Sequence, residues 1–242
     1  GTIGVTVYGA IFARGGSKGV PGKNLRHVGG RSLLAHAVMT GRGARWVDKV
    51  IVSTDAAEII AEARLLGAEV PFRRPSRLAG DHSPEWEAWQ HLARHLVGKG
   101  ASESDLLVSL PATSPLRIPR DVDDAVETFR HGSFDLVLAI TESKHSPWFN
   151  MVTCDASGRL ELAFPGAKNR VTRRQDAPKL FDITTVVYVT SLGFVIRNDG
   201  VFSGNVGAVR VPAHRALDID TPLDLDIADY LMKKRARQDE KS

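Results

Sequence analysis

The clearest chemical signal in the chain is a loop over residues 13–25 that mixes cations with glycines, Ala-Arg-Gly-Gly-Ser-Lys-Gly-Val-Pro-Gly-Lys-Asn-Leu. Arg14, Lys18 and Lys23 place positive charge in this loop. Its glycines permit tight turns and close approach of the backbone to a ligand, and successive backbone N–H groups in such a loop can bind an anion. We therefore predict a polyphosphate site. The alternative is a solvated glycine-rich turn with ordinary surface charge.

A second candidate site is acidic. Asp218 and Asp220 alternate in an extended stretch, which places both carboxylates on one side, about 6.5–7 Å apart along the chain. Both precede Thr221, the expected N-cap of the last helix, so favourable charge at the helix N-terminus explains Asp224 better than it explains them. Mg²⁺ is commonly held by one or two carboxylates together with substrate phosphates. We therefore predict that Asp218 and Asp220 bind Mg²⁺, helix-terminus charge being the alternative.

Two familiar phosphate-binding patterns do not fit the loop. In G-x-x-x-x-G-K-[ST], Ser17 would take the position of the first glycine and Asn24 that of the final hydroxyl residue. The dinucleotide-binding pattern G-x-G-x-x-G is also missing from the loop. The sequence therefore disfavours a P-loop NTPase and a standard dinucleotide-binding protein.

The composition and charge of the chain exclude several further classes of protein. The chain has 242 residues, is 43% hydrophobic and 25% charged, and has a net charge of +4, which fits one α/β domain. Positive charge gathers in residues 1–47 and negative charge in residues 218–229, which suits an anionic ligand with a bridging metal better than nucleic acid. No apolar run is long enough to span a membrane, and we expect no signal peptide. A single cysteine, Cys154, excludes an intrachain disulfide, and cytoplasm is the expected compartment.

The hydrophobic pattern predicts strands that alternate with helices, and hence a mostly parallel sheet flanked by helices. We expect strands over 3–12, 49–53, 69–72, 105–110, 135–141, 186–190 and 207–212. The first helix is expected to begin at Ser32. Asp55 is expected to be the N-cap of the second helix, and Ser83 and Pro84 to be the N-cap and first residue of the third. The tryptophans of the helix that follows Ser83 are expected in the core.

Residues 142–183 break this alternation. Residues 151–164 alternate weakly around Asp155-Ala156-Ser157-Gly158, which predicts a hairpin turn. We expect a lobe that mediates a homodimer, the commonest closed symmetry, with Trp148, Phe149 and Phe164 as exposed apolar candidates. The rest of the chain, within residues 1–242, is predicted to form one domain.

A further loop follows the expected strand over 105–110. Thr113, Ser114 and Arg117 are candidate ligand contacts there. The alternative is a hydroxyl-stabilised turn that caps the next helix.

Four segments in this order resemble the N-acylneuraminate cytidylyltransferases, the CMP-sialic acid synthetase family. They are residues 13–25, Thr113-Ser114-Pro115-Leu116-Arg117, Arg174-Gln175-Asp176 and Asp218-Ile219-Asp220-Thr221-Pro222. The resemblance implies a Rossmann-like sheet with a small dimerisation lobe. It also implies transfer of CMP from CTP to a nine-carbon α-keto sugar acid, with release of pyrophosphate and a requirement for Mg²⁺.

The resemblance assigns roles to individual residues. Catalytic roles fall to Arg14, Lys18, Lys23, Arg174 and Asp220. Substrate-binding roles fall to Gly15, Gly16, Ser17, Asn24, Arg74, Ser83, Thr113, Ser114, Arg117, Arg173 and Gln175. Within this set Arg74 and Ser83 match positions that line the cytidine or ribose pocket, and Arg173 and Arg174 match basic positions that face the phosphates or the sugar carboxylate.

Two departures leave the acceptor open. Pro111-Ala112 stands where the family commonly has Gln-Pro, and Thr184-Thr185 stands where many members have Asn-Gly. Neuraminic, legionaminic, pseudaminic or deaminated acids therefore all remain as acceptors. The alternatives are a non-catalytic nucleotide-sugar binding protein of this fold and a related nucleotidyltransferase with another acceptor.

Overall fold

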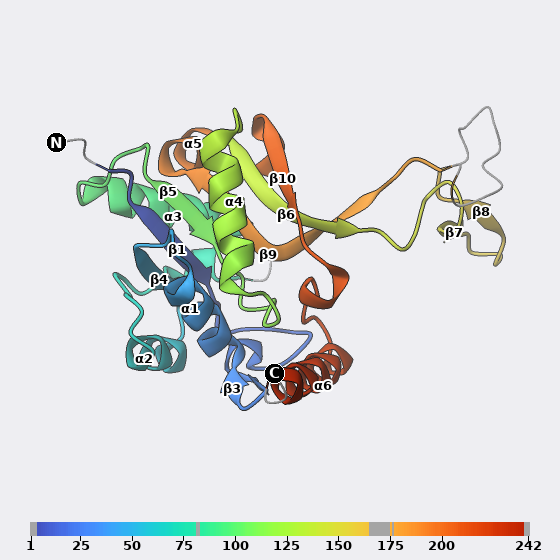
Figure 1. The fold of residues 1–242 in the computed structure, drawn as a ribbon, viewed down its shortest axis with the longest axis horizontal. Coiled ribbons are helices and arrows are strands. Elements are labelled where there is room, and N and C mark those ends of the chain that lie inside the picture. Colours follow the sequence, from blue (N-terminus) through green and yellow to red (C-terminus); the bar gives the residue numbers. More distant parts are fainter. Residues whose placement is uncertain (1–3, 81–82, 165–174, 176, 240–242) are drawn as a thin grey trace.

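A six-stranded sheet forms the centre of the molecule in the computed structural model, which describes residues 4–80, 83–164, 175 and 177–239 (Figure 1). The strand order is β10-β6-β9-β5-β1-β4. The strands are β1 Val7–Phe12, β4 Lys49–Ser53, β5 Leu106–Ser109, β6 Leu136–Glu142, β9 Phe181–Ser191 and β10 Val206–Arg210. Strand β9 runs antiparallel to β5 and β6, and the other neighbouring pairs are parallel. The predicted α/β class with a mostly parallel sheet is confirmed.

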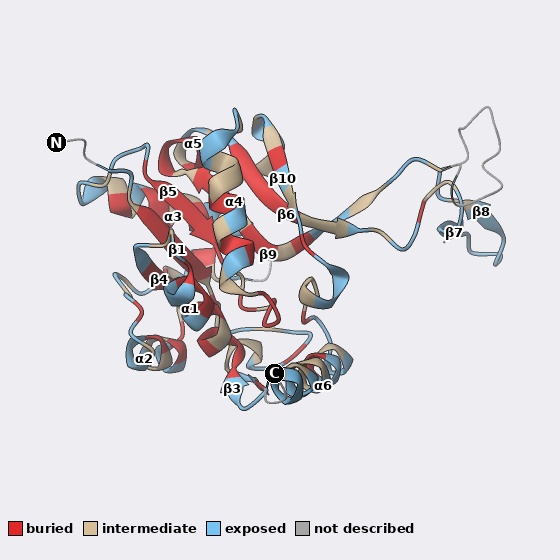
Figure 2. Cartoon of the chain, viewed as in Figure 1, coloured by how far each residue is buried: buried red, intermediate tan, exposed pale blue. Residues whose placement is uncertain are grey.

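Helices cover both faces of this sheet. One core gathers α1 Leu33–Gly43, α2 Ala57–Leu65, α4 Pro119–His131 and α6 Pro222–Asp239, and the other gathers α3 Glu85–Gly98 and α5 Leu192–Arg197. Alternate strand residues supply the two cores, with Val108 on one face and Leu107 on the other, as the period-two geometry of a strand requires. Because both faces are buried (Figure 2), the strands read as continuous apolar runs.

Several predicted boundaries need correction. The expected strand over 69–72 is a single bridge between Ile51 and Glu69, because Pro71 has no N–H with which to extend the ladder. The expected strand over 3–12 begins only at Val7. Asp55 is not an N-cap, since α2 begins at Ala57, one residue later than Asp55 would cap. Helix α3 begins at Glu85 rather than Pro84.

The predicted start of the last helix is confirmed. Thr221 and Asp224 exchange hydrogen bonds: the Thr221 N–H donates to Asp224 Oδ2 at 2.7 Å, and the Asp224 N–H donates to Thr221 Oγ1 at 3.3 Å. This reciprocal pair satisfies donors that a helix N-terminus leaves open. Asp224 therefore serves the start of the helix, and the same Oδ2 also accepts the Asp220 N–H at 3.0 Å.

The segment over 142–183 leaves the sheet as an arm, visible at the right of Figure 1. Strands β6 and β9 continue as a two-stranded ribbon through the pairs Ile140–Ile183 and Glu142–Phe181. Beyond it lies the hairpin of β7 Val152–Cys154 and β8 Leu160–Leu162. The predicted turn is confirmed, with Gly158 at φ 84° and Asp155 accepting the Ser157 N–H.

The described residues also form short helical turns, η1 Lys23–Leu25, η2 Ser76–Leu78, η4 Val201–Ser203 and η5 Ala213–Arg215. Strands β2 His27–Val28 and β3 Arg31–Ser32 pair as a small ribbon. Across the part of the chain that the structure describes, no helix is long and apolar enough to cross a membrane.

Candidate active site

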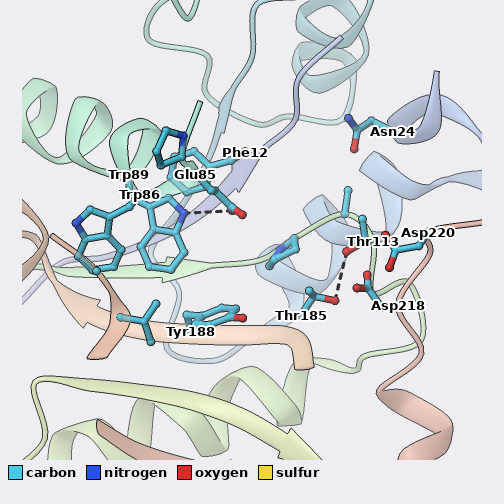
Figure 3. Close-up of a pocket in the computed structure, with 15 residues that line it drawn as sticks. Phe12, Asn24, Glu85, Trp86, Trp89, Thr113, Thr185, Tyr188, Asp218 and Asp220 are labelled. Atoms are coloured by element: carbon cyan, nitrogen blue, oxygen red, sulfur yellow. Dashed lines mark hydrogen bonds between the residues drawn. The ribbon is translucent and has the colours of Figure 1, made fainter. Parts of the chain in front are cut away.

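A cleft of about 520 Å³ opens beside the carboxyl ends of β1 and β5 (Figure 3), the edge at which α/β sheets bind ligands. Its two ends differ in chemistry. Polar side chains, among them Asn24, Thr113, Thr185, Asp218 and Asp220, lie at one end. Aromatic rings and one carboxylate, from Phe12, Glu85, Trp86, Trp89 and Tyr188, lie at the other.

The basic loop and the aspartate segment meet at the polar end, although they lie almost 200 residues apart in the chain. The Lys23 ammonium donates to the carbonyl of Ile219 at 2.8 Å and lies 3.5 Å from Asp220 Oδ1. A Cβ added at Gly19 would stand 2.5 Å from the Asp220 carbonyl oxygen. That approach is possible only without a side chain at position 19. The loop is therefore held against the acidic segment by contacts that its lysine and its glycine each make.

Other hydrogen bonds shape the loop itself. The Asn24 side chain donates to the Arg14 carbonyl at 3.0 Å, and Gly22 takes φ 63°, which favours glycine. The Gly15 N–H donates to Asp55 Oδ1 at 2.9 Å. This backbone donor is therefore engaged by the protein rather than turned toward an anion.

The aspartate pair has the features of an oxygen-ligand site. Oδ1 of Asp218 is buried and has no hydrogen-bond partner within the described residues, whereas Asp220 is exposed. The Ile219 N–H between them donates to the Thr113 carbonyl at 2.9 Å and so fixes the segment to the loop after β5. The described residues contain no group of three or more His, Cys, Asp or Glu placed to hold a metal. Two carboxylates, one of them unsatisfied, fit Mg²⁺ that takes its remaining ligands from phosphates and water.

The aromatic end is built by the first turns of α3 and by β9. Trp89 is 4% exposed and confirms the expected core position, but Trp86 is only half-buried and lines the cleft. The Trp89 indole N–H donates to Glu85 Oε1 at 3.2 Å. Glu85 is exposed to solvent, and partial desolvation by the neighbouring protein atoms raises the pKa of its carboxyl. Burial likewise raises the pKa of Tyr188 to about 12, so its hydroxyl keeps its proton.

A smaller hollow of about 220 Å³ adjoins this cleft and shares Phe12 and Glu85 with it. Arg74 and Ser83, which the resemblance assigns to one pocket, both line it, and Arg14 of the basic loop lines it with them. The Arg74 side chain is buried and donates to Ser53 Oγ at 3.1 Å, and burial lowers its pKa. Ser83 Oγ donates to the Arg77 carbonyl at 2.6 Å.

Several predicted site residues are not placed to line either hollow. Ser114 is buried, and its hydroxyl pairs with Thr185 Oγ1 at 2.7 Å. Arg117 is also buried and donates to the carbonyls of Val186, at 2.7 Å, and Pro111; desolvation lowers its pKa to about 9. Arg117 therefore ties the loop after β5 to β9 through two of its donors, while its buried Nε has no hydrogen-bond partner within the described residues. Arg117 lines neither hollow, so its predicted contact with a ligand stays a prediction.

The remaining predicted residues fall in two places. Gly16, Ser17 and Lys18 lie in the basic loop beside the cleft, with Lys18 exposed. Gln175 lines a separate hollow at the base of the arm with Glu142 and Lys179. Arg173 and Arg174 lie outside the described residues.

The cleft residues that the sequence did not indicate as site residues include Glu85, Trp86 and Tyr188. Glu85 is the first residue of α3, where an acidic side chain is expected on dipole grounds alone. Tyr188 sits within an apolar strand. Neither Glu85 nor Tyr188 has a local sequence signal that distinguishes it from a residue with a purely structural role.

An α/β sheet with a basic glycine-rich loop facing a carboxylate pair at its strand ends is an arrangement suited to binding a nucleotide. The sequence profile of the cytidylyltransferase family matches residues 9–176, more than half of the chain. The chain therefore belongs to the cytidylyltransferase family, and it is a nucleotidyltransferase, as the motifs predicted.

The chain is also similar to individual named proteins. The chain is 30% identical over 228 residues to the post-translational flagellin modification protein B of Campylobacter coli, covering 94% of this chain and 95% of that one. It is 29% identical over 222 residues to a CMP-N,N'-diacetyllegionaminic acid synthase of Campylobacter jejuni, covering 92% and 93%. A CMP:2-keto-3-deoxy-manno-octonic acid synthetase solved with CTP shares the fold, with a TM-score of 0.71, 17% identity, and coverage of 95% of this chain and 99% of that one.

Proposed function

We propose that this cytidylyltransferase activates a nine-carbon α-keto sugar acid as its CMP-sugar, using CTP and releasing pyrophosphate. The observation that carries the proposal is the meeting of Lys23 with Ile219 and Asp220, next to the unsatisfied Oδ1 of Asp218. This contact brings a cationic loop and two carboxylates to one end of a cleft large enough for a sugar. The names of the legionaminic, pseudaminic and neuraminic relatives support the class of acceptor.

The two hollows suggest how the substrates divide the site. The smaller hollow, with Arg14, Arg74 and Ser83, suits the cytidine. The triphosphate then runs along the basic loop toward Asp218 and Asp220. The larger cleft is left for the sugar acid, whose reacting hydroxyl must reach the same polar end.

The proposed chemistry is in-line displacement at the α-phosphate. The anomeric 2-hydroxyl of the sugar attacks phosphorus, the bond from the α-phosphate to the bridging oxygen breaks, and pyrophosphate leaves. Negative charge grows on the phosphoryl oxygens, which Arg14, Lys18 and Lys23 stabilise electrostatically. We assign Asp220, whose carboxylate is exposed in the cleft, to accept the hydroxyl proton. Asp218 and Asp220 would hold Mg²⁺, which supplies further neutralisation of phosphate charge.

The arm is proposed to mediate a homodimer. Phe149 is 38% and Phe164 50% exposed, and the ring of Phe164 packs on that of Trp148 at 5.3 Å. Apolar side chains exposed on a projecting hairpin favour a protein contact. Because Gln175 lies outside the cleft of its own chain, its predicted contact with substrate requires the cleft of a second copy.

Light scattering at micromolar concentration tests the assembly. We expect a dimer that a Phe149→Asp and Phe164→Asp pair weakens, with the fold kept. A particle of monomer mass for the parent chain contradicts the dimer.

A pyrophosphate-release screen of the four nucleoside triphosphates against a panel of sugar acids tests the reaction. We expect release with CTP and nine-carbon α-keto acids, and none without the sugar. An eight-carbon acid belongs in the panel, since release with it alone would make the protein a transferase with another acceptor. No release with any acid would overturn the proposed reaction.

A further inference from the structure

One carboxylate of the cleft has no part in the proposed reaction. Asp218 and Asp220 stand at the polar end, whereas Glu85 stands at the aromatic end (Figure 3). The described residues that line this cleft include no lysine, arginine or histidine. The phosphates and the sugar carboxylate are anions, so Glu85 cannot serve them. An ionised carboxylate accepts hydrogen bonds only, and its partner in the complex must therefore be a donor on the sugar.

The protein satisfies Glu85 only in part. Within the described residues it accepts one hydrogen bond, from the Trp89 indole at 3.2 Å. Its carboxylate points toward the middle of the cleft (Figure 3). Desolvation raises its pKa, and Arg74, on the side of the smaller hollow, opposes that effect. Because Glu85 is exposed in the free protein, a ligand that covers its carboxylate displaces water and must supply a donor in its place.

The surroundings of Glu85 present ring surface rather than further donors. The Trp86 indole N–H is already used by the carbonyl of Asn198 at 2.7 Å. The ring centroids of Trp86 and Trp89 lie 5.2 Å apart, and the Tyr188 ring packs edge-on against the Trp89 ring with centroids 5.6 Å apart. A group that fits here combines a hydrogen-bond donor with a carbon surface that packs on the exposed side of Trp86.

We propose that Glu85 is a specificity-determining residue, which accepts a hydrogen bond from an N–H group on a nitrogen substituent of the sugar while that substituent packs on Trp86. A bare hydroxyl offers the donor but leaves the rings uncovered, and an ester covers the rings but offers no donor. A free amine and an acylamino group share the required N–H. This inference rests on the proposed function, because it places the sugar acid in the cleft.

Matched acceptors isolate the hydrogen bond. The sugar acids carry acetamido, amino, hydroxyl or O-acetyl at one carbon, and kcat/KM is measured at saturating CTP. We expect the parent enzyme to prefer acetamido over O-acetyl by about 10- to 100-fold, the usual value of a hydrogen bond to a charged group. Glu85→Leu should abolish that preference. Glu85→Gln, which keeps an acceptor for Trp89, should reduce it. A preference for the free amine over acetamido would identify the nitrogen as charged.

Glu87→Gln is the control. Glu87 lies on the same helix but lines a different hollow with Arg77 and Arg94, and its substitution should leave the acetamido preference unchanged. A preference that survives Glu85→Leu, or is absent from the parent enzyme, overturns the inference.

Binding separates this inference from the proposed function. Titration of the same four acids by tryptophan fluorescence, in the presence of CDP, needs no turnover. Acetamido binding that weakens in Glu85→Leu, without pyrophosphate release, would retain the subsite and reject the reaction. Equal binding of acetamido and O-acetyl acids rejects the subsite, and absence of binding by all four rejects both.

Discussion

The two ends of the cleft are built in different ways. The polar end gathers three separated segments, namely the basic loop, the loop after β5 and the stretch over 218–220, through backbone contacts such as Ile219 N–H to Thr113 at 2.9 Å. The aromatic end takes its rings chiefly from consecutive turns of α3, with Tyr188 from β9 and Phe12 from β1. The polar end therefore depends on the fold to assemble its charges, whereas the aromatic end depends on side-chain packing.

This difference suggests a division of labour. Phosphoryl transfer needs charges and carboxylates held in place before the substrates arrive, which backbone contacts provide. Recognition of an acceptor needs only a surface of the right shape and donors or acceptors at one or two points. Changes at the polar end should thus lower turnover for every acceptor, and changes at the aromatic end should alter which acceptor is used.

The sharpest way to test this division is to remove the carboxylate pair. Asp218→Asn together with Asp220→Asn should lower kcat by more than about 10²-fold for all acceptors, because phosphate charge then lacks its metal ligands. Each single variant should recover part of its activity as Mg²⁺ is raised. Asp226→Asn is the matched control, since Asp226 is an exposed carboxylate on α6; it should leave both the activity and the Mg²⁺ dependence unchanged. A double variant with the parent's activity and metal response would place the metal elsewhere.

Lys18→Ala probes the basic loop with a smaller expected effect. Removing one preorganised charge near a transferring phosphate lowers the rate by about 10²–10³-fold, by analogy with oxyanion donors, and we expect the variant to remain folded, which thermal unfolding checks. Lys49→Ala is the control, because Lys49 is an exposed lysine that pairs with Glu69 on the edge strand β4. If Lys18→Ala turns over like Lys49→Ala and binds CTP equally, the loop does not act through this charge.

The two tryptophans of α3 separate stability from recognition. Trp89→Ala should lower the free energy of unfolding by about 3–5 kcal/mol, since the ring is almost fully buried. Trp86→Ala should cost less stability, because its ring is half-exposed, but should raise KM for the sugar acid with little change in KM for CTP. Chemical denaturation and steady-state kinetics on both variants decide the matter. Equal losses of stability with no kinetic difference would remove Trp86 from the cleft's recognition surface.

The smallest expected effect concerns the stability of the free enzyme. Desolvation raises the pKa of Glu85, so the folded state binds its proton more tightly than the unfolded state does. The charged form is therefore unfavourable to folding at neutral pH, and this penalty disappears once pH falls below the ordinary carboxyl pKa. Glu85→Gln should raise Tm slightly at pH 7 and not at pH 4. If the difference in Tm between the parent and Glu85→Gln is the same at both pH values, the ionised Glu85 carboxylate does not destabilise the fold.

The apolar periodicity and the capping residues predicted most of the helices and strands, because both features depend on residues only a few positions apart. The first helix forms where the pattern predicts it, with Ser32 as its N-cap rather than its first residue, the hydroxyl accepting the Ala35 N–H at 3.0 Å, and Thr221 starts α6 as expected. The predictions were wrong where contacts with distant segments of the same chain decided the local structure. Asp55 has the type and position of a cap, but its carboxylate accepts the Gly15 N–H from the basic loop instead. The direction of β9 also depends on where the arm returns to the sheet, which no periodicity encodes.

What the sequence determined by itself is the set of chemical groups and their local geometry: a glycine-rich cationic loop, two alternating carboxylates, and the elements that carry them. What only the tertiary structure decided is which of these groups share one space. It placed Lys23 against Asp220, buried Arg117 among backbone carbonyls, and set Glu85 beside Trp89 at the aromatic end of the cleft. The physical reason is that residue types and backbone spacing act over a few positions, whereas burial and cross-chain contacts depend on every element that packs at the same strand ends.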